Sequence, residues 1–208
     1  MMEPYLCLAQ PAEHEIVVKK SRFICNLIPV ETEREAREAL AAIKKKHYDA
    51  RHNCYAMSLG GNIKKSSDDG EPQGTAGVPM LEVLSRSGIT NILAVVTRYF
   101  GGTLLGAGGL VRAYGASVSQ ALAGAKKEWH IPAAVLRFTV EYADYSKLQS
   151  IAAEFGARVE AEYGEQVAAR MVLRLTDCAA AEKRINEAFL GAKVYERDGE
   201  CFLIEAAE

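Results

Sequence analysis

A glycine-rich segment at residues 98–112 is the strongest chemical signal in the sequence. It has the sequence RYFGGTLLGAGGLVR, in which five of fifteen residues are glycine. Glycine permits positive φ angles and lets a backbone approach a ligand closely, and the free N–H groups at the start of a following helix favour an anion. The candidate ligand-binding residues of this segment are Arg98, Tyr99, Gly101, Gly102, Gly106, Gly108, Gly109 and Arg112. The alternative is a tight turn whose glycines serve only strand–helix packing, and the sequence leaves both interpretations open.

The spacing of these glycines excludes two common nucleotide-binding motifs. A P-loop requires lysine after its second glycine, but Gly106 is followed by Ala107, and the run GAGGLV departs from the dinucleotide pattern. An anion-binding role therefore depends on the arginines. Arg98 ends a predicted strand, where ligands of open α/β sheets bind. Arg112 lies early in a predicted helix, where a cation is disfavoured unless an anion is near.

An acidic loop upstream could supply that anion. Residues 60–78 form a polar stretch, and we expect a long loop there because it has no regular pattern. Asp68, Asp69 and Glu71 could hold Mg²⁺ together with a phosphate, or they could pair with the two arginines. The spacing favours the internal pairing. We therefore predict no metal site, and we expect the acidic loop and the glycine-rich segment to form one site.

His52 and Cys54 are a second pair with possible chemistry. They lie two residues apart on a predicted strand, so their side chains point to the same face. A Cys–His nucleophilic pair is conceivable, but no third group that could orient the histidine is evident. The sequence favours polar positions on a half-buried strand, and His52 remains a candidate ligand-binding residue.

The elements that must position these residues in the first half form an α+β pattern. The apolar run Ile92–Val96 predicts a strand at the centre of a sheet, because it is apolar on both faces. Thr32 is a good N-cap for a helix. We expect strands at residues 14–19, 23–30, 50–59 and 92–100, and helices at 32–46, 79–84 and 110–125.

The second half has the order βαββαβ, which is typical of ferredoxin-like domains. Asp144 and Asp177 are expected to cap its two helices, and Gly156 and Gly191 to end them. We expect strands at residues 135–142, 158–163, 166–175 and 193–204, with a possible break at residues 198–199. The boundary is placed at Ile131-Pro132, which gives domains 1–132 and 133–208.

Composition limits the classes of protein and of partner. The five cysteines are odd in number and scattered, which argues against a disulfide framework or a zinc site and favours a reducing cytoplasm. The sequence contains neither a signal peptide pattern nor a membrane-spanning apolar run. Residues 1–132 carry 16 Lys and Arg against 13 Asp and Glu, whereas the remainder carries 9 against 14. The first domain can therefore accept an anionic partner, although the whole chain has a net charge of −2.

Several of these segments resemble the signature of the IMPACT/YigZ family. The resemblance is carried by the runs DDGEPQGTAG at residues 68–77, RYFGG at 98–102 and LGAGGL at 105–110, with KSRF at 20–23 and HNCYA at 52–56. It covers roughly residues 15–127, and the remainder resembles the small C-terminal domain of the bacterial two-domain members. The resemblance implies a ribosomal-protein-like first domain similar to domain IV of elongation factor G, and a second domain similar to the last domain of that factor.

The resemblance also implies a link to translation, and no catalytic residues follow from it. The leading hypothesis is a noncatalytic binder of RNA, the ribosome or a translation factor, with no cofactor and no membrane partner. One alternative is an enzyme acting on a phosphate-bearing small molecule with a carboxylate-held metal. Another is a protein–protein regulator of a stress-response translation pathway that uses the same surface.

Overall fold

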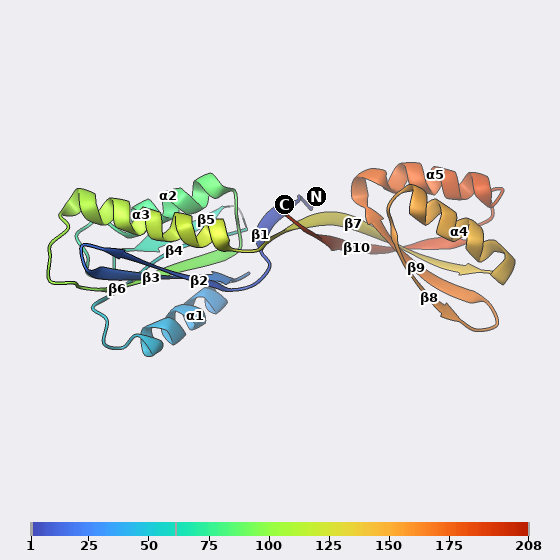
Figure 1. Cartoon of the computed structure of the whole chain (residues 1–208). Helices are drawn as coiled ribbons and strands as arrows, with labels where there is room; N and C mark the ends of the chain where they lie inside the picture. Colours follow the sequence, from blue (N-terminus) through green and yellow to red (C-terminus); the bar gives the residue numbers. More distant parts are fainter. Residues whose placement is uncertain (1, 61, 208) are drawn as a thin grey trace. The chain divides into compact units, whose positions relative to one another are not determined.

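The computed structural model describes residues 2–60 and 62–207 of the chain. These residues form two compact units, mainly Tyr5–Glu128 and mainly Trp129–Glu205, and each unit combines a sheet with helices (Figure 1). None of the helices in the described part of the chain is both long enough and apolar enough to cross a membrane. The predicted two-domain α+β organisation is confirmed.

The first unit is built on a five-stranded antiparallel sheet with the order β2-β3-β6-β4-β5. The strands are β2 (Ala12–Val18), β3 (Ser21–Pro29), β4 (His52–Leu59), β5 (Ile63–Ser67) and β6 (Ile92–Tyr99). Every residue of β6 from Ile92 to Arg98 is buried, because strands flank it on both sides and helices cover both faces. The prediction of a central strand from its apolar run is confirmed. A short strand, β1 (Tyr5–Leu8), precedes the sheet.

Helices cover the two faces of this sheet unequally (Figure 1). Helix α1 (Glu33–Lys46) lies on one face, and the Thr32 side chain caps it by accepting a hydrogen bond from the Glu35 amide at 3.2 Å. Helices α2 (Gly77–Ser87) and α3 (Ala107–Gly124) cover the other face, where their apolar residues pack on Phe23 and the inward side of β6. The larger core therefore lies beneath the helices that flank the acidic loop and the glycine-rich segment.

One expected loop contains regular structure. Residues 63–67, within the polar stretch expected to be a long loop, form the edge strand β5 and pair with β4. Lys64 and Lys65 are exposed there. Lysine on an edge strand discourages pairing with another chain, but it also removes the apolar alternation by which a strand is recognised.

The second unit has the βαββαβ order that the sequence predicts. It comprises β7 (Lys127–Val140), α4 (Tyr142–Glu154), β8 (Arg158–Tyr163), β9 (Val167–Arg174), the short 3₁₀ turn Leu175–Asp177, α5 (Cys178–Ala188) and β10 (Tyr195–Ala206). The strands β8, β9, β7 and β10 are neighbours in that order. Both helices pack on one face, with Leu148, Ile151 and Ile185 among the core residues.

Three details of this half differ from the sequence-based expectation. Ile131 and Pro132 lie inside the continuous strand β7 rather than in a linker. Helix α4 is capped by Glu141, and Asp144 lies in its first turn, because the helix begins earlier than its apolar spacing indicates. The last strand is unbroken, since Gly199 adopts a positive φ of 87° within it.

Candidate functional site

Three strands of the first unit bring charged and aromatic residues together at one end of the sheet. In the strand register, Arg98 on β6 lies between Phe23 on β3 and His52 on β4. Tyr99, the next residue of β6, lies opposite Arg22 on β3. This end of the sheet also carries the β2–β3 turn and the start of the glycine-rich segment (Figure 1).

Arg98 is a buried cation with a buried partner. Its Nη1 atom donates to Oε1 of Glu71 at 2.7 Å, and the two side chains are 8% and 3% exposed. The guanidinium carbon lies 5.5 Å from the ring centre of Phe23 and 5.7 Å from that of Phe100. Its Nε atom is buried and has no hydrogen-bond partner in the described part of the chain. Arg98 is thus fixed in place and keeps unused hydrogen-bonding capacity.

A buried network holds Glu71 in position. The Tyr114 hydroxyl on α3 donates to Oε1 of Glu71 at 2.8 Å, and the Cys54 sulfur lies 3.4 Å from the Tyr114 oxygen. Burial raises the pKa of Tyr114 and raises the pKa of the Cys54 thiol to about 12. Both groups therefore keep their protons at neutral pH, which the hydrogen bonds require.

The other two carboxylates of the acidic loop have separate structural roles. Asp68 accepts hydrogen bonds from the amides of Gly74, Ala76 and Gly77 at 2.8, 3.0 and 2.8 Å, so it satisfies the N-terminus of α2. Asp69 pairs with Lys44 at 2.7 Å and accepts from the Asn53 amide at 2.7 Å.

Because each acidic residue of this loop has its own partners, the three carboxylates do not gather into a cluster with the geometry of metal ligands within residues 2–60 and 62–207. The internal pairing predicted for this loop is what the structure has for Glu71 and Arg98.

His52 is oriented by the same loop. Its Nδ1 atom lies 2.9 Å from the carbonyl oxygen of Asp69, and a carbonyl can only accept, so Nδ1 carries the hydrogen. The Cys54 thiol donates instead to the carbonyl of Asp68 at 2.9 Å. With its raised pKa, that thiol is not a thiolate at neutral pH, so the nucleophilic pair considered from the sequence is not formed.

An open pocket of about 460 Å³ lies where these residues meet. Its lining residues are Asp49, Arg51, His52, Arg98, Tyr99, Phe100 and Leu104. We call this the arginine pocket. Phe100 is 53% exposed and Leu104 is 81% exposed. Arg51 forms no salt bridge within the described residues, whereas Asp49 accepts a hydrogen bond from the Tyr99 hydroxyl at 2.9 Å. The pocket therefore combines cations with exposed apolar surface.

The glycines of the segment serve its conformation. A Cβ on Gly101 would lie 2.0 Å from the carbonyl carbon of Lys20, so the chain can cross the β2–β3 turn only with glycine there. Gly102 and Gly106 have φ angles of 83° and 73°. Gly108 and Gly109 form the first turn of α3. These contacts support the packing interpretation of the glycines. The residues of the segment that line the arginine pocket are Arg98, Tyr99, Phe100 and Leu104.

Arg112 does not join this site. It is exposed on α3 and lines a separate hollow of about 240 Å³ with Lys19 and Leu105. Among the described residues it forms no salt bridge with the acidic loop. Of the two arginines expected to face the three carboxylates, Arg98 pairs with Glu71 alone. The expectation is wrong for Arg112, because the second turn of α3 faces the β2–β3 turn instead.

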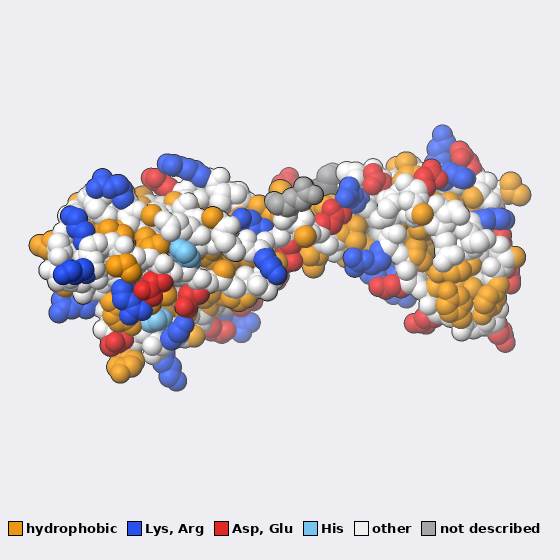
Figure 2. Space-filling view, viewed as in Figure 1, with side chains coloured by type: hydrophobic (Ala, Val, Ile, Leu, Met, Phe, Trp, Pro, Cys, Tyr) orange, Lys and Arg blue, Asp and Glu red, His pale blue; other side chains and the backbone are white. Residues whose placement is uncertain are grey.

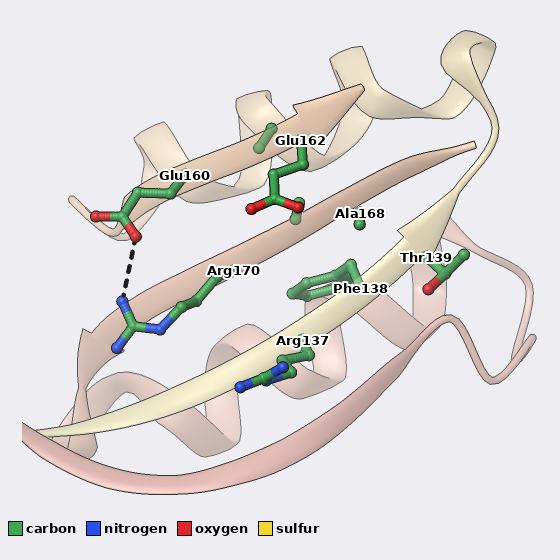
Figure 3. Close-up of a pocket in the computed structure, with 9 residues that line it drawn as sticks. Arg137, Phe138, Thr139, Glu160, Glu162, Ala168 and Arg170 are labelled. Carbon is green, nitrogen blue, oxygen red and sulfur yellow. Dashed lines mark hydrogen bonds and ion pairs between the residues drawn. The ribbon is translucent and has the colours of Figure 1, made fainter. Parts of the chain in front are cut away.

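The second unit has a pocket of different character. It is an open hollow of about 610 Å³ on the sheet, lined in part by Arg137, Glu160, Glu162 and Arg170 (Figure 3). Arg170 pairs with Glu160 at 3.4 Å, and Arg137 pairs with Asp198 at 2.5 Å. Its charges are balanced and its only aromatic lining residue, Phe138, is buried. This face lacks the excess of cations that an anionic ligand requires.

Known proteins share both units. The model of the Impact N-terminal domain matches residues 19–122, and a domain of unknown function, DUF1949, matches residues 138–192. The IMPACT family member YigZ of Escherichia coli is 38% identical over 177 residues, which cover 83% of this chain and 87% of YigZ. The chain belongs to the IMPACT family. The family match includes every residue of the arginine pocket.

Other IMPACT family members extend the comparison. A member from Haemophilus influenzae is 38% identical over 85% of this chain and 87% of its own length. The member YvyE of Bacillus subtilis is 58% identical over 59% of this chain, and the match spans 57% of that relative. A crystal structure described as that of a hypothetical protein aligns with a TM-score of 0.63 and 33% identity, over 100% of this chain and 99% of the other.

Several residues of the arginine pocket were not among the sequence candidates. Sequence patterns do not identify Phe100 and Leu104 as binding residues, because an exposed apolar residue in a loop belongs to no periodic pattern. Arg51 and His52 are neighbours in the sequence, yet both line the pocket, because residue 51 precedes the start of β4. Tyr114, which supports the pocket through Glu71, fits the apolar face of its helix by spacing, and only its hydroxyl distinguishes it there.

Proposed function

We propose that this IMPACT family member is a noncatalytic, translation-associated protein that binds RNA at the arginine pocket. The observation that carries the proposal is the combination of Arg98 and Arg51 with the exposed ring of Phe100 in one hollow. Arginine contacts phosphate and stacks on bases, and aromatic side chains stack on unpaired bases. The link to translation comes from the family resemblance.

The charge around the pocket supports an anionic partner. Its one lining carboxylate, Asp49, already accepts a hydrogen bond from Tyr99. Lys19 and Lys20 are exposed on the β2–β3 turn, which packs against Gly101 beside the pocket. Figure 2 shows several Lys and Arg side chains at this end of the first unit, at the left of the view. Clustered cations of this kind provide the sequence-independent part of nucleic-acid binding.

The bonding of the polar groups supports a binding role over a catalytic one. Cys54 and Tyr114 are held in their protonated forms, and the carboxylate of Asp68 already accepts hydrogen bonds from three backbone amides. General acid–base catalysis requires a titratable group within reach of a substrate proton. The protein partner that each carboxylate of the acidic loop already has argues against the rival hypothesis of a carboxylate-held metal.

Capture from cell extract tests the proposal. Tagged full-length protein should retain RNA and ribosomal material, and nuclease treatment should release it. Affinity for a purified RNA should fall with added salt, with a slope in log K against log salt of about −0.7 per phosphate contacted on a single strand. Capture of the same proteins with and without nuclease, together with no RNA affinity, would instead favour the protein–protein regulator.

A further inference from the structure

The depth of Arg98 in the arginine pocket restricts the form of nucleic acid that can reach it. The residue is only 7% exposed and lies between the rings of Phe23 and Phe100. A duplex presents its phosphates on two stiff strands at fixed spacing, whereas a single strand can bend so that one phosphate enters a hollow. A recessed cation therefore favours a flexible strand.

The rim of the pocket points to the same conclusion independently. Phe100 and Leu104 leave apolar surface open to solvent beside the arginines. Base faces in an A-form duplex are stacked on one another and cannot contact a protein ring, whereas unpaired bases stack on aromatic side chains. Within a nucleic acid, only an unpaired base can cover this surface.

The polar groups of the pocket are of two kinds, those that can bind a phosphate and those that can bind the adjacent sugar or base. Arg51 and Arg98 supply hydrogen-bond donors for a phosphate. Nδ1 of His52 is bonded to the Asp69 carbonyl, so the ring nitrogen that can still bond to a ligand is Nε2. Asp49 lies on the same wall and would repel a second phosphate, but its carboxylate can accept from a ribose hydroxyl or a base amino group. The charges of the pocket therefore suit one phosphate together with one adjacent sugar and base.

We propose that the arginine pocket takes one phosphate and the adjacent unpaired base of single-stranded RNA, and that it discriminates against duplex RNA. This inference rests on the proposed function. Arg98 and Arg51 hold the phosphate, and Phe100 stacks on the base. Glu71 and Tyr114 hold Arg98 in place, because Glu71 accepts from Arg98 and Tyr114 donates to Glu71, and neither residue lines the pocket.

The test uses full-length protein and one labelled oligoribonucleotide of about ten nucleotides, free or annealed to its complement, at one salt concentration. Fluorescence anisotropy should give an affinity for the free strand at least about tenfold higher than for the duplex. Phe100→Ala should lower the single-strand affinity about tenfold and leave the duplex affinity unchanged, while Phe100→Tyr should restore it.

Val78→Ala is the matched control. Val78 is 49% exposed in the same unit and does not line the pocket, so its truncation should leave both affinities unchanged. Melting temperatures of all variants verify folding, which the exposure of both side chains should preserve.

Two negative outcomes of this test have different meanings. Equal affinity for the free strand and the duplex, or a Phe100→Ala variant that binds like wild type, would overturn this inference and leave RNA binding in place. No affinity for either form would overturn the proposed function, and the inference would fall with it.

Discussion

Arg98 and Glu71 form a salt bridge of 2.7 Å in which both side chains are more than nine-tenths buried. Arg98 comes from the central strand β6, and Glu71 comes from the loop between β5 and α2. The pair therefore fastens the acidic loop to the end of the sheet. Removing two charges from water costs several kcal/mol, and this cost is offset only when both partners are present and well bonded.

Replacing one partner of this pair should destabilise the protein more, per substitution, than replacing both partners together. Glu71→Leu alone and Arg98→Leu alone should each lower the free energy of unfolding by about 3–5 kcal/mol, because each leaves one buried charge uncompensated. The double variant should be more stable than the sum of the two losses predicts. Urea unfolding of the four proteins forms a double-mutant cycle. Additive losses would show that the two side chains are not coupled.

Arg51 should affect binding without affecting stability. It is exposed and forms no salt bridge in the described part of the chain, so Arg51→Ala should leave the melting temperature unchanged. It should lower RNA affinity about tenfold, which corresponds to about 1.4 kcal/mol, and reduce the magnitude of the salt slope by about 0.7. Arg86→Ala is the control, since Arg86 is an exposed arginine of the same unit outside the arginine pocket. Equal losses in both variants would mean that only total charge matters.

Gly101 should tolerate no side chain. In Gly101→Ala the new Cβ would lie 2.0 Å from backbone atoms of Lys20, so the β2–β3 turn must shift. We expect a loss of at least about 1–3 kcal/mol in the free energy of unfolding, as in other overpacked sites. The matched variant is Gly115→Ala, within α3, where the new Cβ would meet only Val83 at 3.9 Å. It should gain about 0.5–1 kcal/mol. Comparable stability of the two variants, measured by denaturant unfolding, would show that the β2–β3 turn can accommodate a side chain at residue 101.

The sequence predicts this fold well where a local pattern marks an element. The run Ile92–Val96 identifies the central strand because it is apolar on both faces, and Thr32 identifies the start of α1 because its capping hydrogen bond is local. Strand β5 escapes prediction because an exposed edge strand carries Lys64 and Lys65 where a buried strand would carry apolar residues. Its position is set by pairing with β4, which the local sequence does not record.

The site is predicted only in part, for a related reason. Charge complementarity anticipates that Arg98 meets the acidic loop, but it does not distinguish Arg98 from Arg112, which faces Lys19 and Leu105. The position of a residue along a helix determines the face on which its side chain lies, but not which other segment of the chain that side chain contacts. The hydroxyl of Tyr114 is the clearest example, because its ring belongs to the apolar stripe while its oxygen completes the network around Glu71.

Asp68 should make the first unit sensitive to acid. Burial by itself would raise the pKa of its carboxyl, but hydrogen bonds from the amides of Gly74, Gly77 and Ala76 outweigh burial and hold the pKa below the ordinary value of an aspartate. A carboxyl whose pKa is lowered in the folded state stabilises the protein fully above its unfolded pKa, and this contribution disappears as the pH falls through the folded pKa.

The melting temperature should therefore fall as the pH is lowered from about 5 to about 2. Asp68→Asn should be less stable than wild type at neutral pH, because its one carbonyl oxygen replaces two carboxylate oxygens that accept three amides. It should also lose part of the acid dependence, so that the two melting curves converge at low pH. Glu160→Gln is the control, because that residue is an exposed carboxylate of the second unit. A constant difference between Asp68→Asn and wild type across this range would show that the charge of Asp68 does not contribute to the capping of α2.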